Sequence, residues 1–335
     1  MTAAVHPLLA ELTGRARTRA HAGAPAARSC PCGTDTLADR PDATVVRHAG
    51  TVAKAHAPDT DPAGLAARLT TAHRLPSVLL PPLAPEAADL HGRLVTFWPY
   101  GVPVDPDDPD AAPWEAAGTL LARLHRTPPP VPLPPMRGPA KAARAVARLR
   151  ASGEVRDRPA ADAVLRAWSA LPPWARAEAP QPDTTTLCHG DLHLGQLVRT
   201  PEAKNTPDAA DAPGTPDIGD AAWRLIDVDD LGVGVPAWDL ARPAAWYACG
   251  LLPPQEWTRF LAAYRAAGGP AVPADGDPWP ALDVPARALT AQTAARALIK
   301  AAEQDRSLDE VERSLVDACA RMTSVPAQLT STLAK

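Results

Sequence analysis

Three oxygen-bearing side chains in the second half of the chain have the types and the order that phosphoryl transfer needs. Asp191 lies in the segment His-Gly-Asp-Leu-His-Leu-Gly-Gln, Gln196 ends that segment, and Asp227 ends the later apolar run Leu-Ile-Asp. A carboxylate can orient an acceptor hydroxyl and take its proton, and carboxylate and amide oxygens suit Mg²⁺ on nucleotide phosphates. We therefore predict that Asp191 is catalytic and that Gln196 and Asp227 are metal ligands.

The histidines and aspartates near these three residues raise the question of a second kind of metal site. His189 and His193 flank Asp191 in a His-x-Asp-x-His pattern that binds metals in some hydrolases. All nine histidines lie at or before His193, and the earlier ones lack paired ligand spacing. A metallohydrolase is therefore disfavoured, and His189 is expected to pack within its loop. Asp229 and Asp230 are expected to be surface or loop-bracing carboxylates.

The composition fits a globular protein with no nucleic-acid or membrane partner. The 335 residues are 46% hydrophobic and 21% charged, and the net charge of −4 gives no basic footprint for nucleic acid or an anionic membrane. No apolar run approaches the roughly 20 residues of a spanning helix. The first residues lack the pattern of a secretory signal, so a cytoplasmic location is expected. The pattern does not distinguish a monomer from a homodimer.

The five cysteines are scattered along the chain. Cys30-Pro31-Cys32 is tighter than a zinc knuckle and has no second cysteine pair, so no metal site is expected there. Cys188, Cys249 and Cys319 stand among apolar residues and are expected to pack as small hydrophobic side chains.

Local patterns predict strands in the N-terminal part and mostly helices after it. Strands are expected at 43–48 and 51–56, joined at Ala49-Gly50, and at 93–98, where Pro99-Tyr100-Gly101 breaks the pattern. Residues 200–220 are rich in Pro, Asp, Ala and Gly and are expected to form a surface insertion. Helices are expected at residues 7–20, 62–73, 114–125, 140–152, 159–170, 254–267, 284–304 and 308–322.

Taken together, these motifs resemble the aminoglycoside phosphotransferase family of the protein-kinase-like superfamily. The resemblance is carried by residues 189–196, by Ile226-Asp227 and by Gly-Val-Pro-Ala-Trp-Asp-Leu-Ala-Arg at 234–242. Weaker matches in the family's order are Lys54 on a strand, Leu-Val-Thr-Phe-Trp as a hinge, and Leu-Ala-Arg-Leu-His on the next helix. The Gln at position 196 is similar to the loops of maltokinase-like and glucosamine-kinase-like members.

The resemblance implies an α+β, bilobal protein-kinase-like fold. A small N-lobe with an antiparallel sheet would occupy residues 1–98, and a larger, mostly helical C-lobe would occupy 99–335. It also implies ATP and Mg²⁺ as cofactors and a small sugar or aminosugar-like acceptor whose hydroxyl receives the γ-phosphate. An aminoglycoside antibiotic O-phosphotransferase, a resistance enzyme, is the alternative that differs only in acceptor.

The resemblance also implies roles for individual residues. Lys54 would contact the α- and β-phosphates, backbone groups near Phe97 and Trp98 would hold adenine, and Asp239 would brace the catalytic loop. The candidate acceptor contacts lie after the catalytic segment and are Arg242, Trp246 and Tyr247. The two aromatic rings among them either stack on a sugar or pack in the core.

Three departures from the family pattern affect this interpretation. Gln196 replaces the usual Asn, offering the same hard amide oxygen on a longer stem. A glycine-rich phosphate loop is absent, and helix 62–73 has no carboxylate to pair with Lys54. A nucleotide-binding pseudokinase that acts as a regulatory module is therefore the second hypothesis. An assay of ATP consumption together with nucleotide binding distinguishes it from an active kinase.

Overall fold

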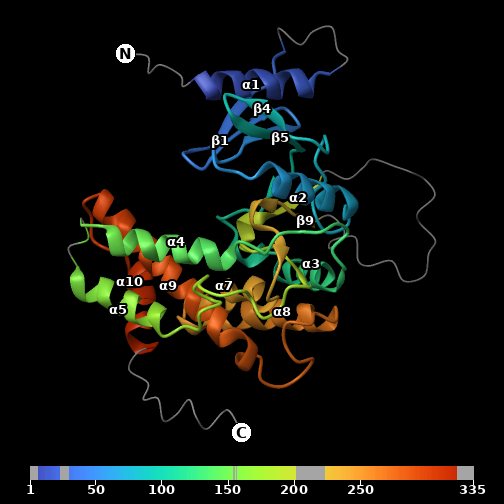
Figure 1. The fold of residues 1–335 in the computed structure, drawn as a ribbon. Coiled ribbons are helices and arrows are strands. Elements are labelled where there is room, and N and C mark those ends of the chain that lie inside the picture. Colours follow the sequence, from blue (N-terminus) through green and yellow to red (C-terminus); the bar gives the residue numbers. More distant parts are fainter. Residues whose placement is uncertain (1–6, 23–29, 154, 156, 201–222, 323–335) are drawn as a thin grey trace. The chain divides into compact units, whose positions relative to one another are not determined.

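The computed structural model describes residues 7–22, 30–153, 155, 157–200 and 223–322, which form two compact units (Figure 1). The first unit comprises residues 1–112, 130–133 and 195–229, and the second comprises 113–129, 134–194 and 230–335. The boundary expected at residue 98 falls within the first unit, which also includes the later segment that carries Gln196 and Asp227. Apart from residue 200, the insertion expected at 200–220 lies outside the described residues.

The first unit is built on a five-stranded antiparallel sheet with strand order β1-β2-β3-β5-β4. The strands are β1 (Thr34–Arg40), β2 (Ala43–His48), β3 (Thr51–Ala55), β4 (Ala88–Leu90) and β5 (Arg93–Pro99). The helix packed on them is α1 (Pro7–Ala20). The two expected strands joined at Ala49-Gly50 are confirmed as β2 and β3, and His48 pairs with Thr51 at their turn. The exposed strand β1 was not expected, because its sequence Thr-Asp-Thr-Leu-Ala-Asp-Arg is polar.

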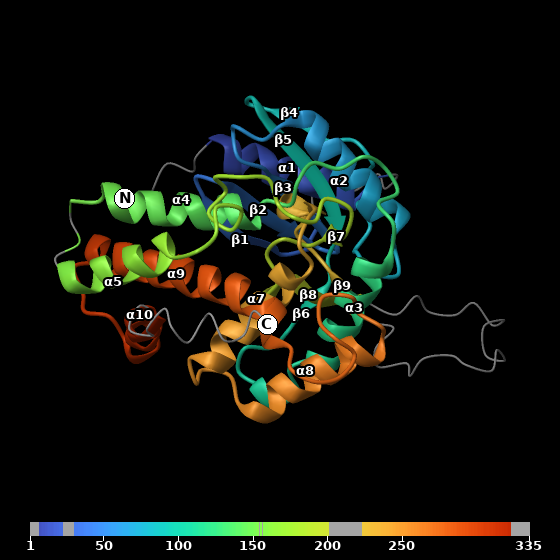
Figure 2. The same cartoon turned by 60° about the horizontal axis from the view of Figure 1, so that its bottom comes forward.

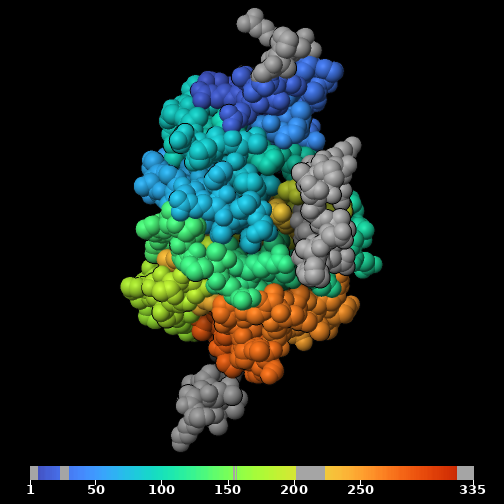
Figure 3. Space-filling model, turned by 90° about the vertical axis from the view of Figure 1, so that its right-hand side faces the viewer, coloured from blue at the N-terminus to red at the C-terminus, as the bar shows by residue number. Residues whose placement is uncertain are grey.

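Helix α1 covers one face of this sheet. Its Leu8, Leu12 and Ala16 recur every four residues and join a buried core with Ala53 and Ala55 of β3. The opposite side of α1 lies on the surface of the unit, where the helix is dark blue in Figure 3. Side chains alternate along a strand, so Lys54, between Ala53 and Ala55, points to the sheet face that α1 leaves uncovered.

A helix and a small second sheet complete the first unit. Helix α2 (Pro62–Arg74) begins at Asp61, whose carboxylate accepts a hydrogen bond from the Gly64 backbone N–H at 2.7 Å. A small antiparallel sheet joins β6 (Val102–Pro103), β8 (Leu197–Arg199) and β9 (Trp223–Leu225). The Ile226 N–H donates to the Gln196 carbonyl at 2.9 Å. This pairing holds the backbone of the two predicted metal ligands, Gln196 and Asp227, side by side.

The second unit is mostly helical, with α9 in contact with four other helices (Figure 2). Its helices are α3 (Trp114–Arg126), α4 (Gly138–Ala151), α5 (Arg158–Ser169), α7 (Ala237–Ala248), α8 (Pro254–Ala266), α9 (Trp279–Glu303) and α10 (Glu310–Met322). Helix α9 packs on α4, α5, α7 and α10. It begins earlier than the expected residue 284, because Pro280 stands in the first turn, where a missing N–H removes no helix bond.

Two short antiparallel strands support the predicted catalytic loop in this unit. They are β7 (Leu187–Cys188) and β10 (Gly232–Val233), and β7 runs directly into His189. Helix α3 packs closely on α8 at Gly118, where a Cβ atom would lie 2.4 Å from the Phe260 carbonyl oxygen. Among the described residues, no helix has both the length and the apolar character required to cross a bilayer.

Candidate active site

A cavity of about 430 Å³ lies in the first unit, on the sheet face opposite α1. This volume is within the usual range for small-molecule sites, about 300–1,000 Å³. Its apolar wall includes Val45, Val52, Leu80, Trp98, Val198 and Ile226. Its polar lining consists of Lys54, His56, Gln196, Asp227 and Asp229. An apolar wall with a small set of charged groups suits a flat heterocycle that carries a charged tail.

Lys54 forms ion pairs with two carboxylates in this cavity. Its Nζ lies 2.6 Å from Asp227 Oδ1 and 2.8 Å from Asp229 Oδ2, and the side chain is 13% exposed. Burial alone would lower the pKa of Lys54, but Asp227 and Asp229 raise it above its ordinary value. The ammonium is therefore charged at every physiological pH.

Asp229 is held in place by a chain of buried polar groups. Its Oδ1 lies 3.0 Å from His56 Nδ1, and His56 Nε2 lies 2.8 Å from the Thr96 hydroxyl. That hydroxyl also accepts a hydrogen bond from Trp98 Nε1 at 2.8 Å. If the Thr96 hydroxyl donates to His56 Nε2, the imidazole proton lies on Nδ1, which faces Asp229 Oδ1 at ion-pair distance but outside hydrogen-bond geometry. Asp229 and His56 are functional candidates that the sequence pattern did not identify.

Gln196 and Asp227 lie side by side, as a shared ligand set requires. The Gln196 Nε2 donates to Asp227 Oδ2 at 3.2 Å, so Asp227 contacts an amide with one oxygen and Lys54 with the other. Asp227 has a φ of 63°, a left-handed conformation that is uncommon for a non-glycine residue and concentrates at functional sites. A half-turn of the Gln196 amide would present its oxygen, so the donor set fits a hard cation such as Mg²⁺.

The expected adenine contacts occupy opposite faces of β5. Trp98 lines the cavity, whereas the Phe97 side chain packs against the core beneath α1. The lining continues through Pro99, Tyr100 and Gly101, so the segment after the strand faces the cavity. A Cβ atom at Gly101 would lie 2.4 Å from Val198 Cγ2, and glycine is therefore required where this segment approaches β8.

The predicted catalytic loop belongs to the second unit, where the carboxylate of Asp239 braces it. Asp239 accepts hydrogen bonds from the backbone N–H of His189 at 2.6 Å and of Gly190 at 2.7 Å. Gly190 has a φ of 87°, and a Cβ atom there would lie 2.4 Å from the Asp230 carbonyl oxygen. The turn before Asp191 therefore requires glycine at position 190.

A second buried chain of hydrogen bonds supports Asp239. His125 Nε2 lies 3.0 Å from Asp239 Oδ2, and His125 Nδ1 lies 2.7 Å from the Tyr264 hydroxyl. The same hydroxyl accepts a hydrogen bond from the Ala271 N–H at 2.9 Å. His125 is thus a buried, hydrogen-bonded core residue.

Asp191 is ion-paired through both of its oxygens. Oδ2 lies 2.6 Å from Lys141 Nζ, and Oδ1 lies 2.7 Å from Arg242 Nη2. Lys141 also lies 2.7 Å from Asp230 Oδ2. Burial alone would raise the pKa of Asp191, but Lys141 and Arg242 lower it. Asp191 is therefore ionised, and the lowered pKa makes it a weak base.

Lys141 is a site residue that the sequence pattern did not single out. Lysine is rare in this chain, with five lysines among 34 basic residues. Two of the five, Lys54 and Lys141, pair with carboxylates of the predicted site. This scarcity is the one sequence signal that could have drawn attention to Lys141.

The candidate acceptor contacts on α7 have different surroundings. Arg242 binds Asp191 and also donates from Nε to the Leu192 carbonyl at 3.0 Å, so its guanidinium braces the loop. Tyr247 stacks on Trp257, with ring centres 5.6 Å apart and planes 16° apart. Trp279 completes this aromatic group. Trp246 is half-buried on the same helix.

Comparison with solved structures shows the fold. A choline/ethanolamine kinase family protein from Mesorhizobium loti is 15% identical, with a TM-score of 0.55 over 94% of this chain and 96% of that one. A choline kinase from Cryptosporidium parvum is 10% identical, with a TM-score of 0.57 over 96% of both chains. A thermostable aminoglycoside phosphotransferase mutant in complex with AMP-PNP and hygromycin B is 14% identical, with a TM-score of 0.51 over 89% and 97%.

These likenesses confirm the expected α+β protein-kinase-like fold. Residues 37–205, about half of the chain, match the phosphotransferase enzyme family, and the chain belongs to that family. No curated protein matches the sequence.

Proposed function

We propose that this protein transfers the γ-phosphate of ATP to a hydroxyl of a small sugar or aminosugar-like acceptor. One observation carries the proposal: Lys54, Gln196 and Asp227 meet in an apolar-walled cavity of the first unit. A cation for phosphates, hard oxygen ligands for Mg²⁺ and a wall for a base are the parts that a nucleotide site needs.

In this proposal the two carboxylates beside Lys54 have different roles. Asp227, next to the Gln196 amide, would turn to Mg²⁺. Asp229, held by His56, would keep the Lys54 ammonium in position against the α- and β-phosphates. When bound, Mg²⁺ supplies charge neutralisation of the phosphates. Asp229 therefore takes the place of the missing helix carboxylate as the partner of Lys54.

Asp191 would be the catalytic residue of the second unit. Because it is ionised, it can accept a hydrogen bond from the acceptor hydroxyl and orient that oxygen toward the γ-phosphate. Lys141 and Arg242 hold its two oxygens and act as positioning residues. Asp239 would keep the loop backbone rigid through the His189 and Gly190 N–H groups.

The acceptor is proposed as an aminosugar or a related polyol. The Gln-bearing loop at position 196 supports a sugar, and the aromatic rings that follow Arg242 suit the apolar face of a sugar ring. Choline-type amino alcohols are the second candidate, because Tyr247 and Trp279, which are half-buried beside the buried Trp257, are aromatic rings of the kind that attracts a cationic ammonium. An aminoglycoside combines both features.

The pseudokinase hypothesis loses one of its two motivations. It depended on the absence of a glycine-rich loop and on Lys54 having no acidic partner, and Asp227 and Asp229 both lie within 2.8 Å of the Lys54 Nζ. An active kinase is therefore the favoured interpretation of the site.

The direct test is an acceptor panel assayed with ATP and Mg²⁺. The panel contains neutral sugars, aminosugars, aminoglycosides, choline and ethanolamine. ADP release is measured with mass spectrometry of each product, and nucleotide binding is measured by calorimetry on the same protein. We expect a phosphorylated aminosugar or aminoglycoside. Phosphorylation of choline instead would show that the acceptor is an amino alcohol and not a sugar. Nucleotide binding without any phosphorylated product would show that the protein is a pseudokinase and not an active kinase.

A further inference from the structure

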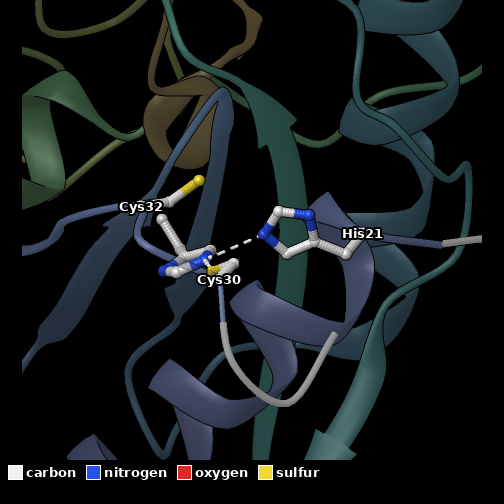
Figure 4. A group of neighbouring side chains, drawn as sticks. His21, Cys30 and Cys32 are labelled. Atoms are coloured by element: carbon white, nitrogen blue, oxygen red, sulfur yellow. Dashed lines mark hydrogen bonds between the residues drawn. The ribbon is translucent and has the colours of Figure 1, made fainter. Parts of the chain in front are cut away.

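Four metal-ligating side chains meet in the first unit, away from the nucleotide cavity. They are His21, Cys30, Cys32 and His48, whose ligand atoms all lie within 4.8 Å of one another (Figure 4). His21 follows the end of α1, the two cysteines precede β1, and His48 ends β2. Three separate segments of the chain therefore converge on one point.

The distances within this cluster are close to those of a tetrahedral zinc centre. His21 Nε2 lies 3.2 Å from His48 Nε2, and Cys30 Sγ lies 3.1 Å from His48 Nε2. With Zn–N bonds of about 2.0–2.1 Å and Zn–S bonds of about 2.3 Å, a tetrahedron places nitrogens ~3.4 Å apart and nitrogen and sulfur ~3.6 Å apart. Shifts of a few tenths of an ångström would open the cluster around an ion.

His48 is oriented as a metal ligand usually is. Its Nδ1 lies 2.7 Å from the Thr34 hydroxyl, which leaves Nε2 directed toward His21 and Cys30. A ligating imidazole commonly donates its other ring N–H to an outer partner that fixes the ring orientation. Thr34 is also the residue that pairs with His48 between β1 and β2, so the sheet register sets this contact.

We propose that His21, Cys30, Cys32 and His48 form a structural Cys₂His₂ site for a zinc ion. Two thiolates and two imidazoles are the soft and borderline ligands that select zinc, and four protein ligands close the coordination sphere, as in structural rather than catalytic sites. The sequence argued against a metal at Cys30-Pro31-Cys32 because no second cysteine pair follows. The structure supplies the other two ligands as histidines from distant positions, which local spacing does not reveal.

The site would stabilise a part of the unit that has little apolar packing. Strand β1 is exposed along most of its length, yet its Leu37 lines the nucleotide cavity. A zinc ion would tie the start of β1 to β2 and to the end of α1. The binding energy of a structural zinc ion contributes directly to folding, so β1 would be held in place without a large core beneath it.

The test is metal binding by the full-length protein, measured without reference to kinase activity. Metal-free protein is titrated with Co²⁺ and then with Zn²⁺, and absorption is recorded. We expect one Co²⁺ per chain with thiolate-to-cobalt charge-transfer absorption and the d–d bands of a tetrahedral ion, followed by displacement by Zn²⁺. Cobalt at the oxygen ligands of the magnesium site would not give the thiolate band, so the two sites are distinguished.

Variants locate the ion. The double substitution Cys30→Ser and Cys32→Ser should abolish the thiolate band, whereas Cys249→Ser, a half-buried cysteine elsewhere, should leave it intact. Thr34→Val should keep the band and weaken Co²⁺ binding about tenfold, the effect of losing an outer partner. Circular dichroism checks that each variant is folded. Absence of a thiolate band in the wild type, or its persistence in the folded double variant, would overturn the proposal.

Discussion

Lys54 and Asp229 are joined by an ion pair of 2.8 Å between Nζ and Oδ2, within the first unit. The partner of this strand lysine therefore comes from the segment after β9, and not from the helix that follows the strand. His56 holds the other oxygen of Asp229 at 3.0 Å. The lysine, the predicted metal ligand Asp227 and the supporting histidine thus form one connected group.

This arrangement predicts how stability depends on pH. Burial alone would raise the pKa of Asp229, but the Lys54 ammonium, together with His56, holds it well below its ordinary value. An unfolded aspartate titrates near pH 3.9, so below about pH 4 the unfolded state binds a proton that the folded state does not bind. The contribution of Asp229 to stability is therefore present at neutral pH and is lost as the pH falls.

The substitution Asp229→Asn tests this contribution. The free energy of unfolding, measured by urea denaturation from about pH 6 to about pH 3, should differ most between wild type and variant at the higher pH. Asp162→Asn removes an exposed carboxylate of α5 and is the matched control. A wild-type advantage over Asp229→Asn that stays constant across this pH range would contradict the ion-pair account.

Thr96 connects Trp98 to His56, and Thr96→Val should destabilise the protein. The substitution keeps the shape but leaves Trp98 Nε1 and His56 Nε2 without their hydroxyl partner, at a cost of about 1–3 kcal/mol. Thr71→Val is the control, since Thr71 is equally buried and its hydroxyl donates to the Ala67 carbonyl of its own helix. Thermal and urea unfolding measure both variants, and equal losses would argue against the chain of hydrogen bonds.

Gln196→Ala should raise the Mg²⁺ concentration needed for half-maximal activity. The variant removes one oxygen ligand of the ion. The required Mg²⁺ concentration should rise at least about tenfold, because even the loss of an outer partner of a metal ligand lowers metal affinity by about that factor. Gln255→Ala changes an exposed glutamine of α8 and should have no effect. An unchanged Mg²⁺ dependence in Gln196→Ala would remove this residue from the metal site.

Asp239→Asn should weaken both the fold and the catalytic loop. One oxygen that accepts hydrogen bonds would become an N–H donor that faces the N–H groups of His189 or Gly190, and the buried carboxylate would be lost. We expect a loss of ~3 kcal/mol in unfolding free energy and a fall in kcat. Tyr264→Phe, at the far end of the chain through His125, should cost less. An unfolding free energy of Asp239→Asn equal to that of the wild type would show that the hydrogen bonds from the loop backbone to Asp239 do not stabilise the protein.

The sequence predicted the elements whose pattern is local. Strands β2, β3 and β5 follow from alternating apolar residues and from turn residues at their ends, and α3 follows from its apolar stripe. Strand β1 was missed because its residues are polar and exposed, so no alternation marks it. Its place at the edge of the sheet depends on pairing with β2, which is a tertiary effect.

The residues of the predicted site are also of two kinds, those that a local motif identifies and those that only the tertiary structure brings to the site. Asp191, Gln196 and Asp227 lie in recognisable motifs, whereas their partners come from distant parts of the chain. Lys54 and Asp227 are 173 residues apart, and Lys141 lies 50 residues before Asp191. No local pattern connects such pairs, so the ion pairs that hold the predicted site required the structure.

The most direct test of the account is phosphoryl transfer by Asp191→Asn, assayed with ATP, Mg²⁺ and the best acceptor of the panel. Asparagine preserves the size of the side chain but cannot accept the hydroxyl proton as a carboxylate does. We predict that kcat falls by about 10²–10⁴-fold while calorimetry finds unchanged binding of Mg²⁺–ATP. A folded Asp191→Asn protein that phosphorylates the acceptor at the wild-type rate would contradict the central claim.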